Sequence, residues 1–227
     1  TPNGLAFPLA TVALTHVVHG RHAYKGLALL AATAMMLRLE LVCLAVPAYL
    51  WTWWHHQRRF VYVFMTGAVT CAGSIALSVL VDSYFWRKRF LWPEGHAVIF
   101  NVIEGRSAEW GVSPPWTYVV RDLPRILFAA FPLALLGCTR RSSFRSPLVL
   151  LICTHVGLMS FLAHKEWRFL VYIVPLCNML AAQGASMLIR TYLGRWLMLG
   201  LVGTSAALWI LGTHVSIYNY PGGEALS

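Results

Sequence analysis

The chain has 227 residues, of which 58% are hydrophobic and only 11% are charged, and its formal net charge is +10. A soluble domain carries roughly 25% charged residues, so this composition excludes a protein with a water-facing surface all round. The Lys and Arg residues lie in short clusters between apolar runs, which is typical of cytoplasmic loops of membrane proteins. The lipid bilayer is therefore the expected surrounding, and no nucleic acid partner is expected.

Six apolar runs approach the length of about 20 helical residues that crosses a hydrocarbon core of roughly 30 Å. The expected membrane spans are, in chain order and with approximate boundaries, 5–20, 60–81, 117–137, 147–162, 169–189 and 196–215. Together with the segment 24–54, they predict an all-α fold: a polytopic transmembrane helical bundle with about six to eight membrane segments.

The loops between these spans form two alternating sets. The first set holds seven Lys and Arg residues in 20 positions and no acid; it comprises 55–59, 138–146 and 190–195. The second set holds six Lys and Arg residues and six acids in 53 positions; it comprises 82–116, 163–168 and 216–227. Because short basic loops stay in the cytosol, we expect the second set to face the opposite, luminal side.

The segment 24–54 is too short for two full spans, although basic residues at both of its ends indicate that both ends are cytosolic. One interpretation is a re-entrant hairpin or broken helix whose tip lies near Arg38 and Glu40. The alternative is one long tilted helix in which these two residues form an ion pair against a neighbour. In both cases the pair is a candidate functional site, since charges at membrane depth are costly.

The loop 82–116 is the only long segment outside these spans, and it contains a short predicted helix at 91–105. Pro93 stands at a suitable first helical position and Gly105 at a suitable stop. Apolar residues between 98 and 103 recur at helical spacing, which indicates an amphipathic helix. We therefore expect a helix that lies in the membrane interface, with Trp92 as an aromatic anchor.

The strongest candidate site is the segment 164–169, His-Lys-Glu-Trp-Arg-Phe, between two charge-free runs. Arg binds a phosphate with a bidentate fork and Lys binds it as a point charge, so His164, Lys165 and Arg168 are candidate phosphate ligands. Glu166 can fix the rotamers of these cations or accept a hydrogen bond from a sugar hydroxyl. The alternative is an interfacial anchor made of long basic side chains.

A second candidate cluster is the segment 82–86, Asp-Ser-Tyr-Phe-Trp, at the end of a predicted span. Asp82, Tyr84 and Trp86 offer the acceptor, the hydroxyl and the flat apolar face that a sugar site needs, although an interfacial aromatic belt would contain the same residue types. Neither a Cys and His spacing for a metal nor a motif of nucleotide-binding or hydrolytic enzymes occurs, so no metal and no cofactor are expected.

The run HKEWRFLVYIVPLCNMLAA resembles the His-Lys-Glu signature of glycosyltransferase family 22, the dolichyl-phosphate-mannose-dependent mannosyltransferases of the endoplasmic reticulum. The runs MLRLELVCL and HVSIYNYPGG are also similar to members of this family. The resemblance implies a GT-C fold in the endoplasmic reticulum membrane, a luminal active site and inversion at the donor carbon. It also implies dolichyl-phosphate-mannose as donor and a dolichol-linked oligosaccharide as acceptor.

The segment 81–125 resembles those members of the family that form an α-1,6 linkage in the N-glycan precursor. A member with α-1,2 specificity, from the dolichol pathway or from glycosylphosphatidylinositol synthesis, and a lipid-phosphate transporter remain as alternatives. The resemblance further implies that the catalytic acid of the family lies upstream of residue 1. We therefore expect 1–227 to be a single but incomplete membrane domain that holds substrate-binding residues and no catalytic base.

Overall fold

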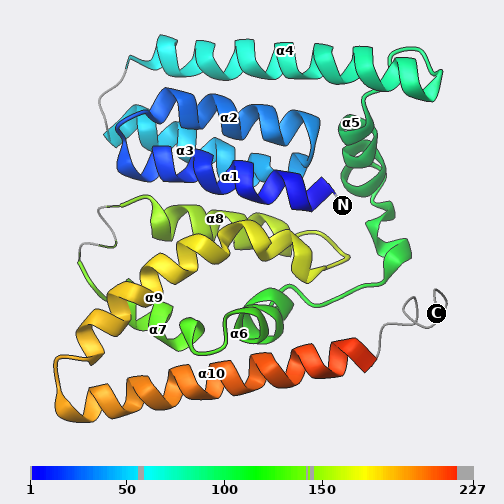
Figure 1. Cartoon of the computed structure of the whole chain (residues 1–227). Helices are drawn as coiled ribbons and strands as arrows, with labels where there is room; N and C mark the ends of the chain where they lie inside the picture. The colour runs from blue at the N-terminus through cyan, green and yellow to red at the C-terminus, as the bar shows by residue number, and fades with distance from the viewer. Residues whose placement is uncertain (1, 56–58, 142, 144–145, 219–227) are drawn as a thin grey trace.

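A computed structural model describes residues 2–55, 59–141, 143 and 146–218, and the regular structure in these residues is helical throughout (Figure 1). The longer helices are α1 (Pro2–His19), α2 (Ala23–Met36), α3 (Val42–His55), α4 (Phe60–Trp86), α7 (Ala130–Cys138), α8 (Leu148–Ser160), α9 (Val174–Leu188) and α10 (Tyr192–Tyr218). The short helices are α5 (Pro93–Val98), α6 (Leu123–Leu127) and the turns η1 (Leu39–Leu41), η2 (Ile99–Ile103), η3 (Arg106–Trp110), η4 (Tyr118–Asp122) and η6 (Trp167–Ile173). The expected all-α fold is confirmed for the described residues.

Within the part of the chain that the structure describes, three helices are long and apolar enough to cross a membrane. They are Phe60–Trp86, Trp167–Leu188 and Tyr192–Tyr218, and they coincide with three of the six expected spans. The expected spans 5–20 and 147–162 also form helices, α1 and α8, but α8 has only 13 residues.

The expected span 117–137 is wrong as a single continuous helix, because the chain breaks at Phe128 between α6 and α7. Phe128 has a positive φ of 47°. The residue four positions later is Pro132, whose ring clashes with a helical carbonyl at position 128. The N–H of Ala129, which the break leaves without a helical partner, donates to the Ser205 hydroxyl of α10 over 3.0 Å.

The segment 24–54 forms two helices, α2 and α3, so the alternative of one long helix is wrong. Arg38 is extended, with φ −157° and ψ 97°, and the turn η1 follows it directly. Each helix has 14 residues, a length of about 21 Å, which is shorter than a full hydrocarbon core. The expected tip near Arg38 and Glu40 is confirmed.

The helices α1 to α4 lie alongside one another, and the loops of the whole bundle gather at its two ends (Figure 1). The C-terminal ends of α1, α3, α7 and α9 lie at the left in this view, whereas those of α2, α4 and α8 lie at the right. The described residues of the two sets of loops that differ in basic content therefore lie at opposite ends of the bundle. The right end carries the described acids of the second set and every candidate site residue.

Helix packing depends on small residues at two places. A Cβ atom on Gly26 of α2 would lie 2.6 Å from the Ala13 carbonyl oxygen of α1. A Cβ atom on Gly184 of α9 would lie 2.0 Å from the Leu133 carbonyl oxygen of α7. Such close backbone approaches are typical of helix pairs in membranes, where small residues allow tight contact.

Candidate functional site

The segment 164–168 comprises the last residues of the connection from α8 and the first two residues of the 3-10 helix η6, at the end of the bundle that carries the acidic loops (Figure 1). Glu166 is extended, with φ −122° and ψ 136°, before Trp167 begins the turn. The chain therefore presents the side chains of His164 and Arg168 next to that of Glu166 and away from a regular helix face.

Glu166 is the centre of this segment. Arg168 grips its carboxylate with two groups, since Nη2 donates to Oε1 over 2.8 Å and Nε pairs with Oε2. His164 Nε2 lies 3.2 Å from the same Oε1. The expectation that Glu166 can fix the rotamers of the neighbouring cations therefore has a geometric basis. Arg168 remains about half exposed, at 48% of its side-chain surface.

Lys165 points the other way, into the protein, and is 6% exposed. Its ammonium group donates to the Leu162 carbonyl over 2.6 Å and to the Ser113 carbonyl over 3.1 Å. Burial lowers the pKa of this ammonium group. Because an ammonium group has three N–H donors, one donor remains for a ligand.

The segment 111–118 is fastened to the His-Lys-Glu segment by further hydrogen bonds. The Ser113 N–H donates to the Ala163 carbonyl over 3.0 Å, and the Glu166 N–H donates to the hydroxyl of the fully buried Tyr118 over 3.2 Å. Sequence reasoning missed Ser113 and Tyr118. Their partners lie about 50 positions away in the chain, so no local spacing indicated them.

Arg38 and Glu40 form the second part of the site, at the break between α2 and α3. Arg38 Nε lies 3.7 Å from Glu40 Oε1, and neither atom has a hydrogen-bond partner among the described residues although both atoms are buried. The charges of Arg38, Glu94 and Arg168 all act on the Glu40 carboxylate. The fold thus brings two candidate pairs, Arg38–Glu40 and Glu166–Arg168, to one region.

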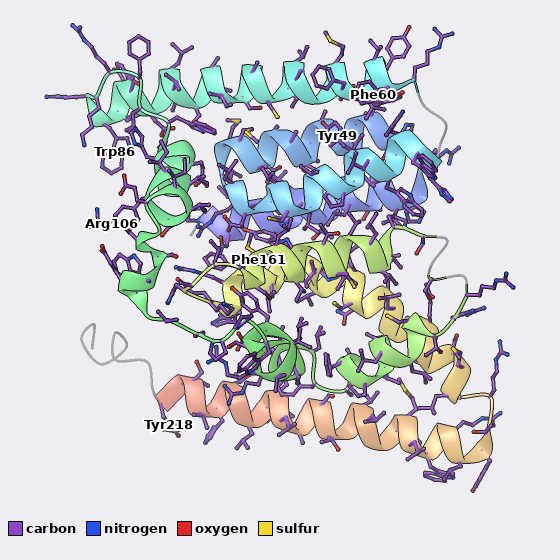
Figure 2. The ribbon with its side chains drawn as sticks, turned by 180° about the vertical axis from the view of Figure 1, so that it is seen from behind. Tyr49, Phe60, Trp86, Arg106, Phe161 and Tyr218 are labelled. Atoms are coloured by element: carbon purple, nitrogen blue, oxygen red, sulfur yellow. The ribbon has the colours of Figure 1, made fainter. Side chains whose placement is uncertain are left out.

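The third group of candidate residues, Asp82, Tyr84 and Trp86, lies on α4. They belong to the last turns of α4, which continues to Trp86, four residues past the expected boundary at 82. Ser78 donates to Asp82 over 2.7 Å, while Tyr84 and Trp86 are exposed at 78% and 67%. Figure 2 shows Trp86 at the corner of the molecule, apart from Phe161, which precedes the His-Lys-Glu segment. Among the described residues, no hydrogen bond or ion pair joins Asp82, Tyr84 or Trp86 to the other candidate residues, although Ser83 accepts from the Leu91 N–H beside Trp92.

The described residues contain no group of three His, Cys, Asp or Glu side chains that could hold a metal ion. This end of the bundle offers a guanidinium fork, an imidazole, a buried ammonium group and several carboxylates. Such a set can bind anionic and polyhydroxylated ligands.

Comparison with known proteins gives consistent relatives. The protein named Dol-P-Man:Man(7)GlcNAc(2)-PP-Dol alpha-1,6-mannosyltransferase of Arabidopsis thaliana is 34% identical over 99% of this chain and 46% of its own length. The protein of the same name from Saccharomyces cerevisiae is 32% identical over 98% of this chain and 42% of its own length. GPI alpha-1,2-mannosyltransferase 3 of Danio rerio is 31% identical over 46% of this chain and 19% of its own length. No solved structure matches.

The chain thus spans less than half the length of these relatives. Residues 1–220 match the model of the Alg9-like mannosyltransferase family, which is almost the whole chain. This match covers both parts of the site, Arg38–Glu40 and 164–168. The chain belongs to the Alg9-like mannosyltransferase family, glycosyltransferase family 22, whose members are polytopic membrane proteins of the GT-C type.

Proposed function

We propose that the chain is part of a dolichyl-phosphate-mannose-dependent mannosyltransferase that forms an α-1,6 linkage on a dolichol-linked oligosaccharide. The observation that carries this proposal is collinear similarity along 98–99% of the chain to relatives named for that reaction. Similarity to the relatives named for α-1,2 transfer covers 46%, 64% and 65% of the chain.

The reaction is one displacement at the anomeric carbon of the donor mannose. The 6-hydroxyl oxygen of an acceptor mannose attacks this carbon and forms the new glycosidic bond with inversion. The bond from the carbon to the phosphate oxygen breaks, and dolichyl phosphate leaves with the electron pair. The proton of the acceptor hydroxyl passes to a carboxylate that acts as general base. Negative charge grows on the departing phosphate, so a fixed cation near it accelerates the step.

Arg168 is the main candidate for that cation, with His164 and Lys165 beside it. Glu166 occupies two of the five N–H donors of the Arg168 guanidinium and leaves the others for a phosphate. Two donors of the buried Lys165 bond the Leu162 and Ser113 carbonyls, which leaves one donor for the phosphate. In this arrangement Glu166 holds the guanidinium plane in place, so that the fork is oriented before the substrate arrives.

Arg38, Glu40 and Glu166 supply the polar groups for sugar hydroxyls on the acceptor side. Asp82, Tyr84 and Trp86, in the last turns of α4 at the same end of the bundle, are further candidates for the sugars of the oligosaccharide. The carboxylate of Glu94 accepts a hydrogen bond from a backbone N–H, and that of Glu166 pairs with Arg168. We therefore assign the general base to neither Glu94 nor Glu166.

We further propose six to eight membrane segments in the endoplasmic reticulum membrane, with the end that carries 82–116 and 163–168 in the lumen. The gathering of the less basic loops at one end of the bundle supports this orientation (Figure 1). The phosphate of the donor and both sugars would then meet at the luminal membrane surface.

The test is mannosyl transfer by the full-length enzyme from dolichyl-phosphate-mannose to the dolichol-linked Man7GlcNAc2 acceptor. We expect a product that an α-1,6-specific mannosidase cleaves. Failure to transfer mannose with intact donor and acceptor would refute the proposal. A product that an α-1,2-specific mannosidase cleaves would show that the enzyme forms an α-1,2 linkage and not an α-1,6 linkage.

A further inference from the structure

The break between α2 and α3 leaves backbone groups without helical partners. The last carbonyls of a helix and the first N–H groups of the next one are not bonded within the helices. At this break the Leu41 N–H donates to the Arg38 carbonyl, but the Leu39 N–H has no backbone acceptor. In a membrane protein such groups must find partners from elsewhere in the fold.

The segment 92–95 supplies those partners from more than 50 positions away. The Trp92 indole N–H donates to the Met35 carbonyl at the end of α2 over 2.9 Å. The Leu39 N–H, at the start of η1, donates to Glu94 Oε2 over 2.8 Å. One short segment therefore caps the end of one helix and the beginning of the next, and the carboxylate stands at a helix N-terminus, where negative charge is favourable.

Local geometry fixes this segment. Pro93 begins α5, and the Trp92 ring lies directly over Gly95, where a Cβ atom would be only 2.2 Å from ring atom Cε3. Glu94 is half-buried, and this burial raises the pKa of its carboxyl group despite the hydrogen bond from Leu39 and the charge of Arg38. The other acids of the loop, Glu104 and Glu109, are exposed and paired with Arg106.

The turn that this segment holds carries Arg38 and Glu40. Arg38 Nε and Glu40 Oε1 are buried, 3.7 Å apart, and without hydrogen-bond partners among the described residues. One donor beside one acceptor suits two neighbouring hydroxyl groups of a hexose, each of which can both donate and accept. Buried polar atoms of this kind are costly unless a ligand satisfies them.

We propose that Trp92, Glu94 and Gly95 form a clamp that holds the Arg38–Glu40 turn in position to bind the acceptor mannose, with Glu94 as a positioning residue for mannosyl transfer. This inference rests on the proposed function. Glu94 acts through Leu39 and does not touch the reacting atoms. Its loss therefore weakens binding of the acceptor and leaves the donor phosphate site at Arg168 unchanged.

The test compares Glu94→Ala, Glu94→Gln and Glu94→Asp in the full-length enzyme, with Glu109→Ala on the same loop as matched control. Loss of the cap in Glu94→Ala should raise the KM for the dolichol-linked acceptor on the order of tenfold and leave the KM for dolichyl-phosphate-mannose unchanged. Glu94→Gln keeps an oxygen that can accept from Leu39 and should restore most of the affinity. Glu94→Asp keeps the charge but is too short to reach, so it should resemble Glu94→Ala.

A second arm disturbs the clamp without removing a polar group. Gly95→Ala forces the Trp92 ring away and should raise the KM for the acceptor in the same direction. Equal acceptor KM values in Glu94→Ala, Glu94→Asp and Glu109→Ala would overturn the clamp. An equal rise in Glu94→Ala of the KM for the acceptor and the KM for dolichyl-phosphate-mannose would overturn it as well. An inactive wild-type enzyme would instead refute the proposed function. In that case the clamp can be tested by the rise in Tm that the acceptor causes, because this rise depends on binding and not on turnover. An equal rise for wild type and Glu94→Ala would overturn the clamp.

Discussion

Replacing Arg168 separates a phosphate-binding role from that of a surface anchor. Arg168→Lys keeps the charge but loses the planar fork that now grips Glu166 through two groups. Arg168→Ala removes the cation altogether. Loss of one donor to a developing oxyanion costs about 10²–10³ in turnover in other enzymes. Because Arg168 is 48% exposed and water screens its charge, we expect the lower end of this range, about 10², for Arg168→Ala, and on the order of tenfold for Arg168→Lys.

The structure offers a matched control in Arg106. Its Nε and Nη2 groups donate to Glu109 over 2.7 and 3.2 Å, which is the same two-point grip on a carboxylate as that of Arg168 on Glu166. Both arginines are about half exposed and lie at the same end of the bundle. If breaking an Arg–Glu pair were sufficient to lower the activity, Arg106→Ala would lower it too. We expect Arg106→Ala to retain nearly wild-type transfer, since exposed ion pairs contribute little.

The assay is transfer of labelled mannose from dolichyl-phosphate-mannose by the full-length enzyme, corrected for the amount of folded protein. The reasoning would be refuted by wild-type turnover in both Arg168 variants, which is what an interfacial anchor predicts, because Lys and Arg both extend to the interface. Equal losses in the Arg168 and Arg106 variants would refute it as well.

Three further predictions concern the fold. Gly184→Ala should destabilise the protein by about 1–3 kcal/mol, because the added Cβ would lie 2.0 Å from a backbone oxygen. In thermal unfolding in detergent, this variant should have a lower Tm than the control Gly200→Ala, whose added Cβ would have no atom within 4 Å. A glycosylation sequon placed in 138–146 should remain unmodified in sealed microsomes, whereas one placed at Glu104 should be glycosylated; the reverse pattern would invert the orientation. Lys165→Met removes both hydrogen bonds to backbone carbonyls and should speed hydrogen exchange in 111–118, and unchanged exchange would show that these bonds do not fasten the segment.

Local signals in the sequence predicted several elements well. Pro93 marks the start of α5, and Gly105, with φ 66°, ends the helical turns that follow it. The charges flanking 24–54 indicated that the chain reverses near Arg38, and it does so. These features depend on a residue and its near neighbours, so the sequence alone contains the information.

Features that depend on distant contacts were not predictable in this way. The ammonium group of Lys165 has the same sequence context whether it faces a phosphate or the Ser113 carbonyl, 52 positions away. The role of Glu94 depends on a helix break 55 positions earlier. The break at Phe128 does not depend on a distant contact, because Pro132, four positions later, indicates it; the length of the apolar run alone does not.

The irregular backbone of this chain and its candidate site lie together for a physical reason. A helix broken at membrane depth is tolerated only where protein groups or a wet cavity satisfy its backbone. At the α2–α3 break, Trp92 and Glu94 each bond one backbone group, whereas the Arg38 and Glu40 side chains keep buried atoms without partners among the described residues. Spare donors remain on Arg168 too. Unpaired side-chain donors and acceptors beside a helix break that other segments cap support the proposal that the substrates bind at this end of the bundle.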